Sequence, residues 1–152
     1  MAFLLREAQD TGALEGALDL LEQAGWARSL LDDWATLGVV LELYDPAEDG
    51  PRGAAVVRAA GQATYELLAW AVSVDTTDPA VLARLVRAIA DALRRAGGQR
   101  ILAAVGDANP ERLTLLQGAG FRFVSVERDA PAADGGRPSD RSRDLLWLDQ
   151  DL

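Results

Sequence analysis

Carboxylates are the main reactive side chains that this sequence offers. The chain has 24 Asp and Glu residues and no histidine or cysteine, and all 15 basic side chains are arginine. These absences exclude a thiol nucleophile, a zinc site built from His and Cys, and a Ser-His-Asp triad. Without lysine, a Schiff base and a phosphate-binding lysine are excluded too. Only carboxylates, Tyr44 and Tyr65 remain for proton transfer, so the sequence indicates a mechanism based on carboxylates or on binding.

Two polar residues, Asp107 and Asn109, follow an apolar run at residues 101–105. At the carboxyl end of a parallel strand they would face the crevice in which open α/β sheets bind ligands. Asn109 also stands directly before Pro110, an arrangement typical of a helix start. Capping a short helix is therefore the alternative role of Asn109.

The stretch from residue 65 to residue 105 predicts a strand, a helix and a second strand. Residues 65–74 form a near-continuous apolar run, which is typical of a strand covered on both faces. A helix is expected from Pro79 with Asp78 as its N-cap, and the glycines at 97–98 end it. A crossover of this length makes the two strands parallel.

Shorter patterns surround this βαβ unit. In the second predicted helix, Trp26, Leu30, Trp34 and Leu37 fall along one side; we interpret the tryptophans as core residues, with a substrate-lining role as the alternative.

The order of the predicted elements is β α α β β β α β α β β, which indicates an α/β sheet of mixed strand direction. The remaining expected elements are a strand at 3–8, helices at 12–25 and 26–38, strands at 39–45 and 53–61, a helix at 111–120, a strand at 121–129, a polar loop at 130–142 and a strand at 143–152 that closes the sheet.

Composition places the chain among ordinary globular proteins. Its 152 residues are 49% hydrophobic and 26% charged, which predicts one domain over residues 1–152. The net charge of −9 argues against a nucleic acid or an anionic membrane as partner, because both bind basic surfaces. Since no membrane-spanning run or signal-peptide pattern is present, we expect a cytoplasmic protein.

Three segments follow a pattern that is shared with a known family. They are ELLAWAV with the helix and GGQRILAAV that follow it, NPERLTLLQGAGFRF, and the closing RDLLWLDQDL. Over nearly its whole length the chain resembles the GNAT superfamily of acyl-CoA-dependent N-acyltransferases. In that family an asparagine precedes a short helix that ends in glycine-phenylalanine, and Asn109 and Gly120-Phe121 stand at this spacing. The resemblance implies a mixed, mostly antiparallel central sheet with a parallel βαβ core and about four helices.

The resemblance also implies an activity, which is transfer of an acetyl or acyl group from acetyl-CoA or another acyl-CoA to an amine of a small molecule or peptide. The two parallel strands would splay apart, and the pantetheine of the cofactor would pair with the strand at Val72 and Val74. Asn109 would contact the cofactor as well. The pyrophosphate would lie at the start of the following helix, which is the turn that contains Thr77, Ala80, Val81 and Leu82.

Glu66 stands near the position at which some family members hold their general base. A carboxylate there can accept a proton if burial raises its pKa. The alternative is a structural glutamate paired with an arginine such as Arg58.

The chain departs from the family at two hallmark positions. Thr77, Ala80 and Leu82 occupy the positions of the basic residue and the glycines of the pyrophosphate turn. As an N-cap, Asp78 would take the N–H groups that a phosphate needs, and its charge would repel the phosphate. We therefore expect a self-capped helix start. Leu116 occupies the position of the proton-donating tyrosine and cannot donate a proton.

Two hypotheses follow. The first is an acyltransferase that binds acyl-CoA through the strand backbone and uses Glu66 or a water relay as base. The second is a non-catalytic domain for binding or scaffolding that has lost the cofactor site. A homodimer through the closing strands or the second helix is compatible with both. Dinucleotide binding is disfavoured, because no glycine-rich fingerprint follows the strand.

Overall fold

The computed structural model describes residues 3–76, 78, 80–129 and 144–152. Within these residues the chain forms seven strands and four helices, in the order predicted from the sequence. The predicted loop at 130–142 lies outside the described residues. In chain order the elements are β1 (Leu4–Glu7), α1 (Thr11–Gln23), α2 (Arg28–Leu37), β2 (Val39–Tyr44), β3 (Gly53–Gly61), β4 (Thr64–Val72), α3 (Ala80–Arg95), β5 (Arg100–Gly106), α4 (Pro110–Gly118), β6 (Arg122–Glu127) and β7 (Leu145–Asp151).

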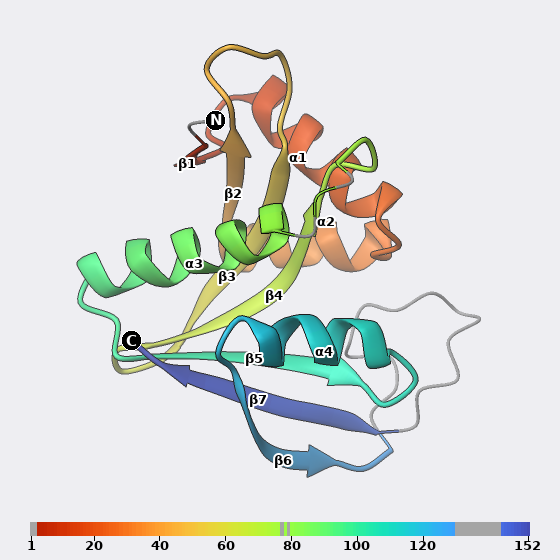
Figure 1. Ribbon diagram of the computed structural model, residues 1–152, viewed down its shortest axis with the longest axis vertical. Helices are drawn as coiled ribbons and strands as arrows, with labels where there is room; N and C mark the ends of the chain where they lie inside the picture. Colours follow the sequence, from red (N-terminus) through yellow and green to blue (C-terminus); the bar gives the residue numbers. More distant parts are fainter. Residues whose placement is uncertain (1–2, 77, 79, 130–143) are drawn as a thin grey trace.

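The seven strands form one sheet in the spatial order β1-β2-β3-β4-β5-β7-β6. β4 and β5 pair in parallel, and the other neighbouring strands pair antiparallel. The expected mixed, mostly antiparallel sheet with a parallel βαβ core is therefore confirmed. Figure 1 shows β2, β3 and β4 running at a steep angle to β5 and β7, because the sheet twists along its width.

The last strand lies inside the sheet, whereas the sequence predicts that it closes the sheet. β7 pairs with β5 on one side and with β6 on the other, so β6 is the edge strand. Burial explains this order: Leu145 and Leu148 of β7 are almost completely buried, whereas every residue of β6 is exposed. The strand with the more buried apolar side chains takes the central position.

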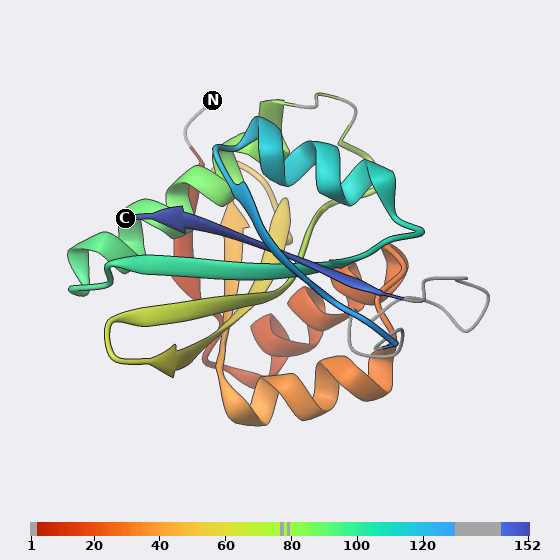
Figure 2. The same cartoon turned by 90° about the horizontal axis from the view of Figure 1, so that it is seen from below.

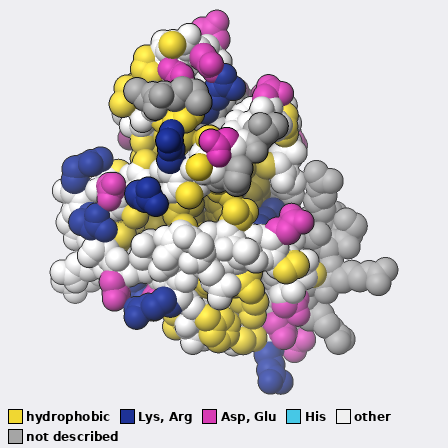
Figure 3. All heavy atoms as spheres, viewed as in Figure 1, with side chains coloured by type: hydrophobic (Ala, Val, Ile, Leu, Met, Phe, Trp, Pro, Cys, Tyr) yellow, Lys and Arg dark blue, Asp and Glu magenta, His cyan; other side chains and the backbone are white. Residues whose placement is uncertain are grey.

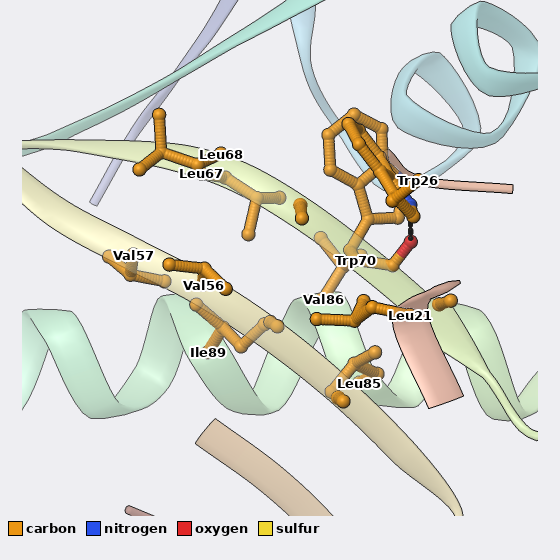
Figure 4. Close-up of a cluster of buried hydrophobic side chains, with 14 of the residues drawn as sticks. Leu21, Trp26, Val56, Val57, Leu67, Leu68, Trp70, Leu85, Val86 and Ile89 are labelled. Atoms are coloured by element: carbon orange, nitrogen blue, oxygen red, sulfur yellow. Dashed lines mark hydrogen bonds between the residues drawn. The ribbon is translucent and has the colours of Figure 1, made fainter. Parts of the chain in front are cut away.

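Helices cover both faces of the sheet, with α3 and α4 on one face and α1 and α2 on the other (Figure 2). The side of α3 that faces the sheet is apolar, and its Leu85 and Ile89 are completely buried. They belong to one core cluster with Leu67 of β4 and Leu21 of α1 (Figure 4). Full burial of each such side chain contributes roughly 1.5–3 kcal/mol.

The buried side of α2 differs from the prediction. Trp26 precedes the helix instead of lying on it, and Leu37 is 63% exposed. Leu31, outside the predicted stripe, is the completely buried residue of α2. The reason is that the helix begins two residues after Trp26, so the helical period does not link Trp26 to the later residues.

Helix ends follow the local sequence signals. The Asp10 side chain accepts a hydrogen bond from the backbone N–H of Ala13 at 2.8 Å, which caps α1. After α3, Gly97 has φ of 88°, and the Gly98 N–H donates to the Leu93 carbonyl at 2.8 Å. A left-handed residue at this point ends the helix as predicted, and glycine adopts it without strain. No helix in the described part of the chain is long and apolar enough to cross a membrane.

Arg28, the first residue of α2, binds four carboxylates and so links α2 to α1. Its guanidinium lies 2.7 Å from Asp19, 2.8 Å from Glu15, 3.1 Å from Asp32 and 3.6 Å from Glu22. The hydrogen bonds that it donates to Asp19 and Asp32 are the main causes that raise the pKa of Arg28 above its ordinary value. Because the pKa is raised in the folded state, the stabilisation is present at every pH below about 12 and is lost only above it.

We predict that Arg28→Met lowers the free energy of unfolding by about 1 kcal/mol, because four carboxylates then repel one another without a central cation. High salt should reduce this loss by screening the repulsion. The measurement is urea unfolding at low and high salt. Arg94→Met is the control, since Arg94 binds the single carboxylate of Asp91 at 2.8 Å. A loss as large in the control would contradict the prediction.

Candidate functional site

β4 and β5 separate part-way along their length. Their parallel ladder joins residues Thr64–Leu67 to Arg100–Ala103. Beyond it, β4 continues beside β3 as far as Val72, and β5 continues beside β7 as far as Gly106. Figure 1 shows the two strands diverging. The predicted splay is therefore present, and it leaves one backbone edge of β4 without a strand partner.

The backbone of Val72 faces this gap. The Ser73 N–H donates to the Arg52 carbonyl at 2.8 Å, on the β3 side of the chain. Because backbone groups alternate between the two edges of an antiparallel strand, the N–H and C=O of Val72 and Trp70 point to the opposite edge. Val72 therefore presents its backbone groups to the gap, and its pairing with pantetheine stays a prediction. Val74 lies beyond the end of β4, and its side chain is 66% exposed.

Two tryptophans occupy the gap. The Trp26 indole N–H donates to the Trp70 carbonyl at 3.1 Å, as the dashed line in Figure 4 shows. The two rings meet edge-on with centroids 5.1 Å apart, and Trp34 lies 6.0 Å from Trp26 in a similar arrangement. The Arg112 guanidinium stacks on Trp26 at 3.9 Å from the ring centroid. The cluster ties the loop after α1 and the start of α4 to the free edge of β4.

Two neighbouring cavities lie next to the gap, and both are lined by Trp70, Leu82 and Leu115. The smaller, about 160 Å³, lies between α3 and α4. The larger, about 260 Å³, reaches Val72 of β4 and the start of α4, where Glu111 and Arg112 line it. Figure 3 shows hydrophobic side chains gathered between these two helices. The gap thus opens into an apolar cleft.

The start of α3 is capped by its own chain. The Asp78 carboxylate accepts a hydrogen bond from the Ala80 N–H at 2.9 Å, and the Asp78 carbonyl accepts one from the Val81 N–H at 3.1 Å. Thr77 and Pro79 lie outside the described residues. The Leu82 side chain lines the cleft. The predicted self-capped helix start is confirmed, and an acidic group stands where an anion would bind.

Glu66 is held by a cross-strand ion pair. It lies opposite Arg58 in the β3–β4 ladder and is 7% exposed. It accepts a hydrogen bond from Nε of Arg58 at 2.8 Å, and Nη2 of the same guanidinium lies 2.7 Å from the carboxylate in the ion pair. This is the pairing that the sequence analysis gave as the alternative to a general base. Among the described residues, Glu66 does not line either cavity of the cleft.

Comparison with solved structures finds acetyltransferases of the same architecture. A Bacillus subtilis acetyltransferase in complex with CoA gives a TM-score of 0.80 at 20% sequence identity, and the match covers 99% of each chain. A GNAT family acetyltransferase from Elizabethkingia anophelis with acetyl-CoA bound gives 0.79 at 16% identity, covering 99% of this chain and 98% of that one. The Escherichia coli ribosomal-protein-S18-alanine N-acetyltransferase gives 0.74 at 16% identity, covering 99% and 94%.

This chain has the GNAT fold. Sequence comparison by itself finds no matching family model and no matching curated protein. At these identities the structural match establishes the fold, and the activities are those of the proteins compared.

Two further positions can be compared with the GNAT pattern. Leu116, which the sequence analysis places at the position of the family's tyrosine, is completely buried and lines the smaller cavity, and its side chain has no proton to donate. Asn109 stands at the N-cap position of α4 and Pro110 is the first residue of the helix, but the Asn109 side chain makes no capping hydrogen bond, so the capping role given as its alternative is not found. Asn109 and Ala108 line a separate cavity at the start of α4.

Sequence patterns missed the residues that shape the cleft of this GNAT fold. Trp70 lies inside an apolar run, so nothing in the pattern shows that its carbonyl faces a gap. Trp26 reads as a core residue, and its burial of all but 3% confirms that reading, but its hydrogen bond to β4 depends on the fold. Glu111 and Arg112 give no signal beyond a charged helix start.

We predict that Trp26→Phe lowers the free energy of unfolding by about 1–2 kcal/mol, because the buried Trp70 carbonyl loses its donor. Thermal unfolding followed by circular dichroism measures the loss. Trp34→Phe is the matched control, since it shortens a ring of the same cluster without removing that hydrogen bond. Equal losses in the two variants would show that ring packing, not the hydrogen bond, stabilises the gap.

Proposed function

We propose that this protein binds acyl-CoA along the free edge of β4 and transfers the acyl group to an amine of a small molecule or peptide. The observation that carries the proposal is the backbone of Val72, which faces a gap that opens into an apolar cleft. The GNAT fold supports it, and two of the similar acetyltransferases contain CoA or acetyl-CoA.

The residues that line the gap fit the pantetheine of acyl-CoA but not its diphosphate. A free strand edge suits the amide groups of pantetheine, which can pair with it as a short added strand. The start of α3 does not suit the diphosphate, because Asp78 already takes the Ala80 N–H and adds a negative charge. We therefore assign the Val72 edge to pantetheine and assign no role in phosphate binding to α3.

The residues of the cleft contribute mainly by positioning the thioester and the amine, and less by transferring protons. When bound, acyl-CoA supplies the thioester that an amine attacks. Trp70, Leu82 and Leu115 give the cleft an apolar wall, and holding two reactants together contributes to the rate by itself. The Glu66 carboxylate is already bound by Arg58. The Leu116 side chain has no proton to donate. Among the described residues that line the two cavities, Glu111 is the carboxylate able to accept a proton from the amine.

We predict that Glu111→Gln lowers the rate of acyl transfer about 100-fold while leaving the dissociation constant of acetyl-CoA unchanged, because the amide keeps the shape but accepts no proton. Release of free CoA with a panel of amines measures turnover, and calorimetry measures binding. Glu7→Gln, on β1 at the other end of the sheet, is the control. A wild-type rate in the Glu111 variant would remove this residue from the mechanism.

A second candidate function is a non-catalytic GNAT-fold domain that binds a partner and no acyl-CoA. The self-capped start of α3 favours it, because the same N–H groups cannot serve both Asp78 and a phosphate. The Arg58–Glu66 pair and the buried Leu116 point in the same direction.

Acetyl-CoA binding separates the two candidates. Under the first, a cofactor present at a hundred times its dissociation constant should stabilise the protein by about 2.7 kcal/mol in thermal unfolding. Asp78→Gly should bind acetyl-CoA more tightly than wild type, because glycine is a tolerated N-cap that leaves the Ala80 N–H free. Asp78→Asn is the matched control, which removes the charge and keeps the cap.

Comparison of acetyl-CoA binding by wild type, Asp78→Gly and Asp78→Asn identifies what hinders the diphosphate. Tighter binding in both variants assigns the obstacle to charge, and tighter binding in the glycine variant alone assigns it to the occupied N–H. No stabilisation of any of the three at millimolar acetyl-CoA would reject the acyltransferase and leave the non-catalytic domain.

A further inference from the structure

Two leucines that replace GNAT hallmark residues line the same cavity. Leu82 stands at a glycine position of the pyrophosphate turn and Leu116 at the position of the tyrosine, and both line the cavity of about 160 Å³ between α3 and α4. Trp70 forms part of the wall, together with Val86 of α3 and Leu115 of α4. Leu116, Val86 and Trp70 are all buried, so this wall belongs to the protein core.

Apolar groups form most of the cavity wall. Two of the described lining residues, Thr114 and Trp70, carry a polar side-chain group, and the Thr114 hydroxyl donates to the Pro110 carbonyl of its own helix at 2.9 Å. A water molecule in a cavity requires about two to four polar partners, whereas an apolar cavity stays dry and accepts a hydrocarbon. The lining therefore favours an apolar occupant.

The size of the cavity bounds that occupant. An apolar cavity of about 150 Å³ holds a molecule as large as benzene, which has about six carbons. The cavity here, about 160 Å³, accordingly holds a chain of similar size. It shares Trp70, Leu82 and Leu115 with the larger cavity, which reaches Val72. A thioester held at the Val72 edge thus has a direct apolar path into it.

We propose that this cavity receives the acyl chain of the substrate thioester, so that the protein prefers acyl groups of about four to six carbons to acetyl. The proposal rests on the proposed function for the location of the thioester. The leucines at 82 and 116 then have a positive role: they form the walls of an acyl-chain pocket where other GNAT chains have glycine and tyrosine.

The experiment measures binding by calorimetry for acetyl-, butyryl-, hexanoyl- and decanoyl-CoA, and in parallel for the N-acetylcysteamine thioesters of the same acids. The second series has a pantetheine-like end but no diphosphate, so the start of α3 cannot interfere. We expect affinity to rise about fourfold for each methylene buried, up to about six carbons, in both series. Decanoyl thioesters should bind no more tightly than hexanoyl.

Two variants test the walls in opposite directions. Ala83→Leu places a larger side chain on the lining of the cavity and should abolish the preference for hexanoyl over acetyl. Leu82→Ala enlarges the cavity and should move the optimum toward decanoyl. Arg87→Leu adds a leucine at an exposed position of the same helix and should leave the hexanoyl-to-acetyl ratio as in wild type. Because the two cavity variants predict opposite shifts, misfolding of one does not imitate the result.

The outcomes separate the two proposals. Equal affinity for all chain lengths would overturn the acyl-chain pocket and leave acyl-CoA binding intact. A chain-length preference with the N-acetylcysteamine series alone would support the pocket and count against CoA as the carrier. Failure of every thioester in both series to bind would overturn both. A rising affinity that Ala83→Leu removes would support both.

Discussion

Beyond Leu67, β4 has no β5 partner, and the backbone groups on that edge must find other hydrogen-bond partners or face an open cleft. Much of the surrounding structure answers this requirement. The Trp26 indole satisfies the Trp70 carbonyl, and to do so the loop after α1 must lie against β4. Arg112 then stacks on Trp26 and brings the start of α4 to the same place. The Trp70 N–H and the backbone of Val72, the next position along that edge, face the cleft.

The carboxylates of this protein are mostly accounted for by structure. Three buried ones, Glu42, Glu66 and Asp149, each receive an arginine from a neighbouring strand, respectively Arg6, Arg58 and Arg100. Such pairs offset the cost of burying a charge, and removal of either partner is costly. In a chain without histidine or lysine, carboxylates are the natural groups for proton transfer. These three, however, are already bound by arginines of neighbouring strands. This is why the proposed chemistry relies on positioning and on Glu111, which lines the cleft.

The changes from the GNAT pattern act together. Asp78 closes the start of α3 to anions, while Leu82 and Leu116 make the space between α3 and α4 apolar. Taken singly, each change weakens one feature of an acetyl-CoA site. Under the proposed function, the three together shift the site from charge recognition to hydrophobic burial, which scales with the apolar area removed from water.

Local signals in the sequence determined the order of the elements, the caps at Asp10 and Asp78 and the self-closed start of α3, because periodicity and capping act between residues a few positions apart. The absence of histidine, cysteine and lysine also excluded whole classes of chemistry without any structure. Only the tertiary structure decided that β7 lies inside the sheet, that Arg58 holds Glu66, and that Trp26 reaches Trp70. These depend on which distant segments become neighbours, and that follows from burial across the whole sheet. The meeting of Leu82 and Leu116 at one cavity is of the same kind, because no pattern within either helix shows that the two helices share a wall.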